Sequence, residues 1–264
     1  MPHAQYTIGT LVTNPQQYAE MRASFASQGF GGSDCEYIAI DNTASGNGNP
    51  QTDAYRGLNQ IINQANGKYV ILCHQDVVLL TDGREELDRR LLELSKADAN
   101  WGLAGNAGAT GTGKIARRIS DKWGSNQNVG TFPQRVMSLD ENFIIVRRDA
   151  RIGFSNDLQG FHLYGTDICL NADIMGYTSY VIDFHLKHLG AGTKGKQFEI
   201  CETAFRNKWR RALRTRHLQT PSTFVLLSGG TLPGGVYGLL EGIEKRSMRI
   251  RNSVQKRLNG PSKG

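Results

Sequence analysis

The sequence has no apolar run long enough to cross a membrane. Its longest apolar runs, Tyr69 to Cys73 and Phe224 to Leu227, are far shorter than the roughly 20 residues that a bilayer requires. The first residues, Met1 to Tyr6, carry no basic stretch followed by an apolar one, which is the pattern of a signal peptide. We therefore expect a cytoplasmic protein.

Cysteine is scarce, and its spacing excludes the common metal and redox motifs. The chain has four cysteines, and no two of them form a C-x-x-C pair. Three lie within or beside apolar runs and one lies in an expected helix. We predict that all four are reduced packing residues: Cys35, Cys73, Cys169 and Cys201.

The charge is basic and is concentrated late in the chain. The 264 residues carry a formal net charge of +7, which favours contact with phosphate on a nucleotide, an anionic lipid or a nucleic acid. No nucleic-acid-binding motif accompanies the charge, so we expect no nucleic-acid partner. A hydrophobic content of 39% suits one fairly large domain. We assign residues 1–220 to that domain and residues 221–264 to a basic, amphipathic, helical tail.

Predicted strands and helices alternate along the first 190 residues. The predicted strands are Tyr6 to Val12, Glu36 to Ile40, Tyr69 to Cys73, Trp101 to Ala104, Asn142 to Val146 and Ser179 to Phe184, the last clear one. The predicted helices are Pro15 to Ala26, Ala54 to Ala65, Arg84 to Ala97, Tyr164 to Met175 and Phe198 to Arg216. This alternation predicts a Rossmann-like α/β fold with a mainly parallel mixed sheet flanked by helices.

Polar residues follow three of the predicted strands. They are Thr13-Asn14, Asp41-Asn42 and His74-Gln75-Asp76. Right-handed crossovers place the carboxyl ends of parallel strands at one edge of a sheet, and ligands bind at that edge. The sequence therefore predicts a nucleotide site where these residues converge.

Three side chains are candidates for chemistry. Asp76 follows a buried strand and suits a divalent cation that also contacts phosphate, although a turn-forming role explains it equally well. His188 follows the last predicted strand, where it is either a structural residue or a second ligand for an ion such as Mn²⁺. Asp167 lies in the first turn of a predicted helix, where it is either a general base or an exposed acid favoured by the helix dipole.

The stretch from Gly105 to Gly130 is rich in Gly and Asn, and we expect it to be weakly structured and functional. Within it, Gly108 to Lys114 matches the start of a P-loop. However, Ile115 occupies the position of the magnesium-binding Ser or Thr. This stretch therefore does not predict an NTPase.

The order and spacing of these segments resemble family 2-like glycosyltransferases with the GT-A fold. The resemblance covers roughly residues 6–190 and is nearest to a small bacterial subgroup whose second acidic motif reads F-H-L-Y-x-x-D-x-C-L, here Phe161 to Leu170. It implies transfer of a sugar from a nucleotide-sugar donor, with UDP-sugars favoured, to a hydroxyl of a saccharide or lipid-linked acceptor. It further implies inversion at the anomeric carbon and a place in bacterial surface polysaccharide or lipopolysaccharide synthesis.

The resemblance also implies a role for individual residues. Asp167 resembles the catalytic base, and Asp76 and His188 resemble the ligands of a divalent metal, Mn²⁺ or Mg²⁺. The implied donor-binding residues are Thr13, Asp41, Asn42, Asn59, His74, Asp76, Asp140 and Glu141. The sequence departs from the family at His74, which replaces the first acid of the D-x-D motif and leaves the identity of the metal open.

Other functions stay open. A catalytically inactive homologue would bind nucleotide sugar without turnover, and a nucleotidyltransferase would also place nucleotide at the strand ends. The basic tail could contact the inner face of a membrane, cover the acceptor cleft or form a subunit contact.

Overall fold

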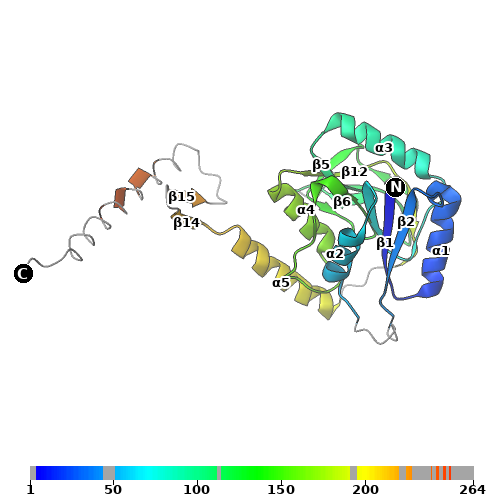
Figure 1. The fold of residues 1–264 in the computed structure, drawn as a ribbon, viewed down its shortest axis with the longest axis horizontal. Coiled ribbons are helices and arrows are strands. Elements are labelled where there is room, and N and C mark those ends of the chain that lie inside the picture. The colour runs from blue at the N-terminus through cyan, green and yellow to red at the C-terminus, as the bar shows by residue number, and fades with distance from the viewer. Residues whose placement is uncertain are drawn as a thin grey trace, which may run out of the picture. The chain divides into compact units, whose positions relative to one another are not determined.

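The fold is built on a seven-stranded mixed sheet in the order β2-β1-β3-β11-β5-β12-β9 (Figure 1). The computed structural model describes residues 4–43, 51–111, 114–190, 195–219 and 224–227, and residues 239, 242, 243, 246, 247 and 250. The strands of this sheet are β1 (Tyr6–Val12), β2 (Cys35–Asp41), β3 (Tyr69–Cys73), β5 (Trp101–Gly105), β9 (Gln134–Val136), β11 (Phe143–Arg147) and β12 (Thr178–Val181). β1 is parallel to β2 and β3, and β5 is parallel to β12, whereas β11 runs antiparallel between β3 and β5. The predicted mainly parallel mixed sheet is confirmed.

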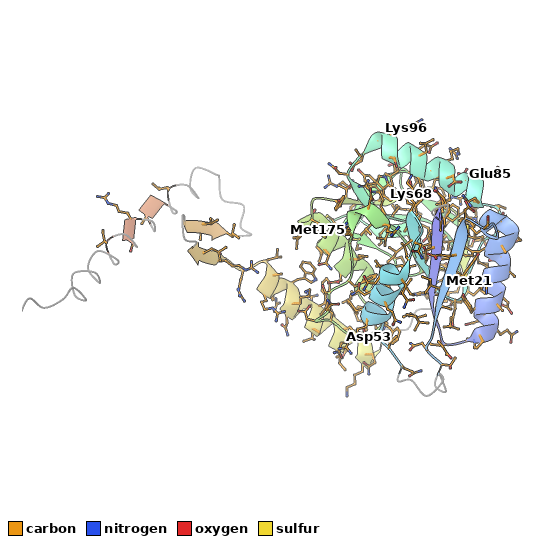
Figure 2. The ribbon with its side chains drawn as sticks, in the orientation of Figure 1. Met21, Asp53, Lys68, Glu85, Lys96 and Met175 are labelled. Carbon is orange, nitrogen blue, oxygen red and sulfur yellow. The ribbon has the colours of Figure 1, made fainter. Side chains whose placement is uncertain are left out.

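Helices pack on both faces of the sheet. They are α1 (Pro15–Phe25), which continues into a π-helical turn (Ala26–Phe30), α2 (Ala54–Gln64), α3 (Arg84–Ala97) and α4 (Tyr164–Ile174), with a 3₁₀ turn at Arg148–Ala150. As predicted, α1 starts after Asn14, whose side chain accepts hydrogen bonds from the N–H groups of Gln16 and Gln17. Asp53, labelled in Figure 2, caps α2 by accepting from the N–H of Arg56.

β3 shows how one apolar run supplies both layers of the core. All five of its residues are buried, because a strand in the middle of the sheet is covered on both faces. Val70 and Leu72 belong to the cluster that includes residues of α2 and α4. Tyr69, Ile71 and Cys73 belong to the second cluster, which includes residues of α1 and α3. The alternation follows from the two-residue period of a strand.

A second, six-stranded sheet has the order β10-β6-β7-β13-β4, with β8 paired to β7. Its strands are β4 (Val77–Val78), β6 (Ala107–Ala109), β7 (Ile115–Asp121), β8 (Gly124–Val129), β10 (Ser138–Leu139) and β13 (Leu186–His188). Three of them lie between Gly105 and Gly130, so the expectation of a weakly structured stretch was wrong. β6 consists of small residues and β8 is almost wholly polar, so neither shows the apolar alternation by which strands are recognised.

Two further expectations are settled by this sheet. The P-loop-like stretch connects the antiparallel strands β6 and β7 rather than a strand and a helix, in agreement with its rejection. The predicted strand from Ser179 is not the last, because β13 follows it.

The four cysteines are free, and Cys73, Cys169 and Cys201 are buried, as predicted.

The chain divides into two compact units, Met1–Phe205 and Arg206–Gly264. Beyond residue 190 the described elements are α5 (Lys196–Ala212) and a hairpin of β14 (Arg216–Gln219) and β15 (Phe224–Leu227). Most of the predicted helical tail lies outside the described residues. Of the described helices, none combines the length and the apolar character needed to span a bilayer.

Candidate active site

A pocket of about 230 Å³ opens at the carboxyl edge of the large sheet. The ends of β1 and β3, the N-terminal end of β11 and the start of α4 bring its walls together. The polar side of its lining consists of Thr13, His74, Gln75, Asp76, Glu141 and Tyr164. The predicted convergence of strand ends on one cleft is therefore observed for β1 and β3, and an antiparallel strand adds a further carboxylate.

Glu141 reaches this edge because of the direction of β11. Phe143, the first residue of β11, pairs with Cys73, the last residue of β3. An antiparallel neighbour presents its N-terminal end where a parallel strand presents its C-terminal end. The residues before β11 therefore lie beside the His74-Gln75-Asp76 segment, and the N–H of His74 donates to the carbonyl of Asn142 at 3.0 Å.

Gln75 joins the ends of β1 and β3. Its Oε1 accepts hydrogen bonds from the N–H groups of Thr13 and Asn14, each at 2.8 Å, and its Nε2 donates to Oγ1 of Thr13 at 2.8 Å. This role of Gln75 is not predictable, because nothing in the sequence shows which neighbouring strand a glutamine contacts. These bonds fix the position of Thr13 in the pocket wall.

Asp76, His188 and His74 form a cluster whose possible ligand atoms lie within 4.8 Å of one another. Nε2 of His188 is 3.3 Å from Oδ1 of Asp76, and Nδ1 of His74 is 3.4 Å from the same His188 nitrogen and 4.0 Å from Oδ1 of Asp76. The small sheet brings them together, because β4 starts directly after Asp76 and its first residue, Val77, pairs with His188. The N–H of Leu189 also donates to the carbonyl of Asp76.

The protonation states of the cluster suit a cation. Burial lowers the pKa of His74, and the neighbouring His188 lowers it further, so neutral imidazole is favoured. Burial alone would raise the pKa of Asp76, but its hydrogen bond and charge interaction with His188 outweigh burial and lower the pKa. The same contact raises the pKa of His188 against the effect of burial, so a cation that binds there displaces a proton from this ring. The ionised carboxylate of Asp76 and the neutral imidazole of His74 need no such change.

A chain of hydrogen bonds fixes the tautomer of His74. The hydroxyl of Tyr164 lies 3.1 Å from the carbonyl oxygen of Glu141 and 2.7 Å from Nε2 of His74. A carbonyl oxygen can only accept, so Tyr164 donates to Glu141 and accepts the proton on Nε2 of His74. Nδ1 of His74 is then unprotonated and faces Asp76 and His188. Metal-binding histidines are commonly oriented in this way by a partner on the other ring nitrogen.

Gly190 packs against this cluster. A Cβ added at Gly190 would clash with Oδ2 of Asp76 and would lie 3.4 Å from Nε2 of His188. Only a residue without a side chain permits this approach of the backbone to the carboxylate. The residues present therefore fit a divalent cation through one carboxylate oxygen and two imidazole nitrogens. This donor set suits Mn²⁺ and other first-row transition metals better than Mg²⁺.

Glu141 is half-buried in the pocket wall, and its carboxylate faces the backbone N–H groups of Leu163, Tyr164 and Gly165 at the start of α4. Burial, followed by the charge of Asp140, raises the pKa of Glu141 to about 8, although the N–H groups at the start of α4 lower it in part. Asp140 itself is exposed and accepts a hydrogen bond from the N–H of Asn142 at 3.0 Å. Asp140 and Glu141 were both predicted to bind the donor, and of the two Glu141 lines the pocket.

Asp167 has different surroundings. Its side chain is 0% exposed, so the alternative of an exposed first-turn acid was wrong. Its two oxygens accept hydrogen bonds from the N–H and the hydroxyl of Ser155, each at 2.8 Å, and a third from Nδ2 of Asn171 at 3.3 Å. Asp167 does not contribute to the lining of the pocket.

Besides Asp140, three more of the predicted donor-binding residues do not line the pocket. The side chain of Asn42 is buried, donates to the carbonyl of Thr52 and accepts from its N–H. Asn59 exchanges hydrogen bonds with the backbone of Phe154 and lines a different cavity. Asp41 is exposed, and its bonds to the N–H and hydroxyl of Thr43 lower its pKa. Asp41 and Asn42 lie at the end of β2 and Asn59 lies within α2, and the two asparagines stabilise loops.

Comparison with known proteins places the fold. No protein-family model matches the sequence. The ATP synthase subunits region ORF 6 protein of Fuscovulum blasticum is 35% identical over 231 residues, which are 85% of this chain and 91% of that protein.

Two solved structures resemble this chain. S. aureus TarS 1-349, in complex with UDP-GlcNAc, matches 74% of the chain with a TM-score of 0.50 and 12% identity. The mannosyltransferase PcManGT from Pyrobaculum calidifontis, in complex with GDP-Man and Mn²⁺, matches 78% with a TM-score of 0.49 and 14% identity. The chain spans 60% and 64% of the length of these two chains, respectively. The likeness to TarS shows that the sheet and its helices have the GT-A fold of glycosyltransferases.

Proposed function

The chain belongs to the same family as the ATP synthase subunits region ORF 6 protein of Fuscovulum blasticum, and we propose that it is a metal-dependent glycosyltransferase. One observation carries the proposal. The His74–Asp76–His188 cluster lies at the carboxyl edge of a GT-A sheet, and two of its residues line the pocket there. Because TarS shares the fold and is in complex with UDP-GlcNAc, a UDP-sugar is the donor that we favour.

The pocket supports a division of roles. Asp76, His188 and His74 would hold the metal, which when bound neutralises charge on the diphosphate of the donor. Thr13, held in place by Gln75, would contact the nucleoside together with Phe161, a pocket residue that is 49% exposed. Three further predicted residues would contact the donor only if the donor extends beyond the pocket: Asp41, Asn42 and Asn59.

The whole catalytic domain is proposed to span residues 1–220.

The reaction that we propose is a single displacement with inversion. The acceptor hydroxyl attacks the anomeric carbon on the face opposite the leaving nucleoside diphosphate, and a carboxylate accepts the hydroxyl proton. The walls of the pocket exclude part of the solvent from this reaction, because Leu11, Leu58 and Leu72 supply its apolar side. Exclusion of water strengthens the electrostatic interactions within a site and limits hydrolysis of the donor.

Isothermal titration tests the donor site. The purified protein is titrated with UDP, GDP, dTDP and CDP, with and without Mn²⁺, and the titrations are repeated with Asp76→Ala. We expect one nucleotide to bind only with Mn²⁺, and Asp76→Ala to abolish this binding. Asp149→Ala, which removes an exposed carboxylate that is paired with Arg147, is the control and should bind normally.

The same titration separates the competing functions. Absence of binding by all four nucleotides in the presence of Mn²⁺ would contradict the proposal. Binding without release of nucleoside diphosphate from any sugar derivative would instead identify an inactive nucleotide-sugar-binding homologue. Release of pyrophosphate from a nucleoside triphosphate and a sugar phosphate would identify a nucleotidyltransferase.

The acceptor that we propose is a hydroxyl of a saccharide or lipid-linked molecule, as used in bacterial surface polysaccharide or lipopolysaccharide synthesis. Leu239, Ile243 and Ile250 are each more than half exposed, and their spacing places them on one face of a helix. The surrounding sequence contains Lys245, Arg246, Arg249 and Arg251. An apolar face with neighbouring basic residues favours the surface of an anionic membrane.

Pelleting with liposomes tests this contact. The full chain and a chain ending at residue 220 are compared on vesicles with and without anionic lipid. We expect the full chain alone to pellet, on anionic vesicles and less at high salt. Equal pelleting of the two chains would contradict the membrane contact without affecting the donor site.

A further inference from the structure

The pocket wall contains a carboxylate that is better placed for proton transfer than the one in the acidic motif. A general base must come within hydrogen-bonding reach of the proton that it accepts. Asp167 is 0% exposed, and both of its oxygens accept hydrogen bonds from Ser155. Opening Asp167 toward an acceptor would break these bonds and leave buried donors without partners.

Glu141 meets the geometric requirement. It lines the pocket together with His74 and Asp76. Its backbone carbonyl is joined to His74 through the hydroxyl of Tyr164 alone, by bonds of 3.1 and 2.7 Å. The start of β11 therefore holds Glu141 at a defined place relative to the metal-binding cluster. Backbone N–H groups at the start of α4 contact its carboxylate, and because Glu141 lines the pocket, an acceptor hydroxyl can also reach it.

We propose that Glu141, rather than Asp167, is the general base of the transfer reaction. This inference rests on the proposed function. In the step, the acceptor oxygen forms a bond to the anomeric carbon while the bond from that carbon to the diphosphate oxygen breaks. The proton of the acceptor passes to the carboxylate of Glu141, and the electron pair of the broken bond leaves with the nucleoside diphosphate. Glu141 then releases the proton to solvent.

The electrostatics of the pocket support this role. The pKa of Glu141 is raised to about 8, by burial first and by the charge of Asp140 second. A base is most effective when its pKa lies near the working pH, because it is then both available and strong. The transfer rate should therefore increase with pH up to about 8 and level off above it.

The test uses a panel of UDP-, GDP-, dTDP- and CDP-sugars with Mn²⁺ and water as the acceptor, and measures release of nucleoside diphosphate. We expect Glu141→Gln to lower the rate by about 10²- to 10⁴-fold, the usual share of a general base. Affinity for the free nucleoside diphosphate should change by less than about threefold, since the variant keeps the metal ligands. Asp167→Asn should keep a rate within about tenfold of the wild type in the fraction that remains folded.

Azide provides a readout that a structural role would not change. It attacks the anomeric carbon without losing a proton, so it needs no base. We expect azide to restore turnover of Glu141→Ala with a glycosyl azide as the product, and to leave Asp76→Ala inactive. Glu141→Asp, which keeps a carboxylate, should retain more activity than Glu141→Gln.

The outcomes separate the base assignment from the proposed function. If Glu141→Gln releases nucleoside diphosphate at the wild-type rate, or if azide restores Asp167→Ala and not Glu141→Ala, the assignment is wrong although the protein is a transferase. If the wild type hydrolyses no sugar nucleotide and binds no nucleotide, the proposed function fails and the assignment fails with it.

Discussion

The carboxylates of Asp167 and Glu141 belong to neighbouring parts of the molecule and have opposite surroundings. Asp167, in the first turn of α4, is fully buried, and three hydrogen bonds from Ser155 and Asn171 satisfy it. Glu141, two residues before the first residue of β11, is half-buried in the pocket wall, where backbone N–H groups at the start of α4 face its carboxylate. A buried acid is therefore a candidate for chemistry only when it can be reached from a pocket. A carboxylate enclosed by its donors stabilises the fold, whereas one that lines a pocket and has a raised pKa can exchange a proton.

The largest expected effect on stability comes from the satisfied carboxylate. Asp167→Ala should lower the free energy of unfolding by on the order of 3 kcal/mol, because buried donors of Ser155 and Asn171 lose a charged acceptor. For a domain of this size the melting temperature should fall by roughly 6 to 12 °C. Thermal unfolding followed by circular dichroism measures this change.

A double-mutant cycle sharpens the result. Ser155→Ala removes one of the same hydrogen bonds, so its effect and that of Asp167→Ala should not add. Glu141→Ala is the matched control and should not lower the melting temperature. A stable Asp167→Ala variant that loses turnover would reverse the comparison and restore the catalytic role implied by the acidic motif.

A smaller effect, on metal affinity, is expected at Tyr164, whose hydroxyl lies between His74 and the carbonyl of Glu141. Tyr164→Phe removes the hydroxyl that accepts from Nε2 of His74 and donates to the carbonyl of Glu141. Loss of such a partner typically lowers metal affinity by about 10- to 100-fold. Titration with Mn²⁺ in the presence of a bound nucleotide measures the change.

Tyr55→Phe is the control for this variant. Tyr55 packs edge-to-face against Tyr164, but its hydroxyl donates to the carbonyl of His162. The Tyr55→Phe substitution should therefore leave metal affinity unchanged. Equal affinities for Tyr164→Phe and the wild type would show that the tautomer of His74 is fixed without this hydrogen bond.

Most of the large sheet could be predicted from the sequence because its strands are apolar runs that end in polar residues, whereas its edge strand β9, with the sequence Gln-Arg-Val, was not predicted. β3 and α3 have the predicted limits, and β1 does as well. The small sheet could not be predicted, since β4, β10 and β13 have two or three residues each and β8 is polar. These short strands are stabilised by pairing with distant segments, which a local pattern does not reveal.

The site was predictable only in part for the same reason. The acid and histidine of the cluster, Asp76 and His188, were identified from their positions after strands. His74 was assigned to the donor. It lies beside Asp76 because Gln75 and Asp76 form a turn in which the N–H of Val77 donates to the carbonyl of His74, and the strand pattern in the sequence does not reveal this turn. The partners of Asn59 and Asp167 lie 95 and 12 residues away, and nothing in the sequence indicates that these side chains are occupied.

A final expected effect concerns the stability cost of keeping Glu141 available. Below about pH 4.5 this group is protonated in both the folded and the unfolded chain. Between pH 4.5 and about 8 the unfolded chain ionises it while the folded chain retains the proton, so this group's contribution to stability decreases as pH rises. Glu141→Gln cannot ionise. The variant should melt at the wild-type temperature at pH 4.5 and above the wild-type temperature at pH 9.

Asp140→Asn provides the control for this pH dependence. It removes the second cause of the raised pKa of Glu141, so the loss of stability should end at a lower pH, and the rise in transfer rate should shift in the same direction. A melting temperature of Glu141→Gln that follows the wild type at every pH would show that Glu141 ionises as freely in the folded chain as in the unfolded one. The two carboxylates would then differ only in their partners, and the pKa of Glu141 would no longer support proton transfer at this site.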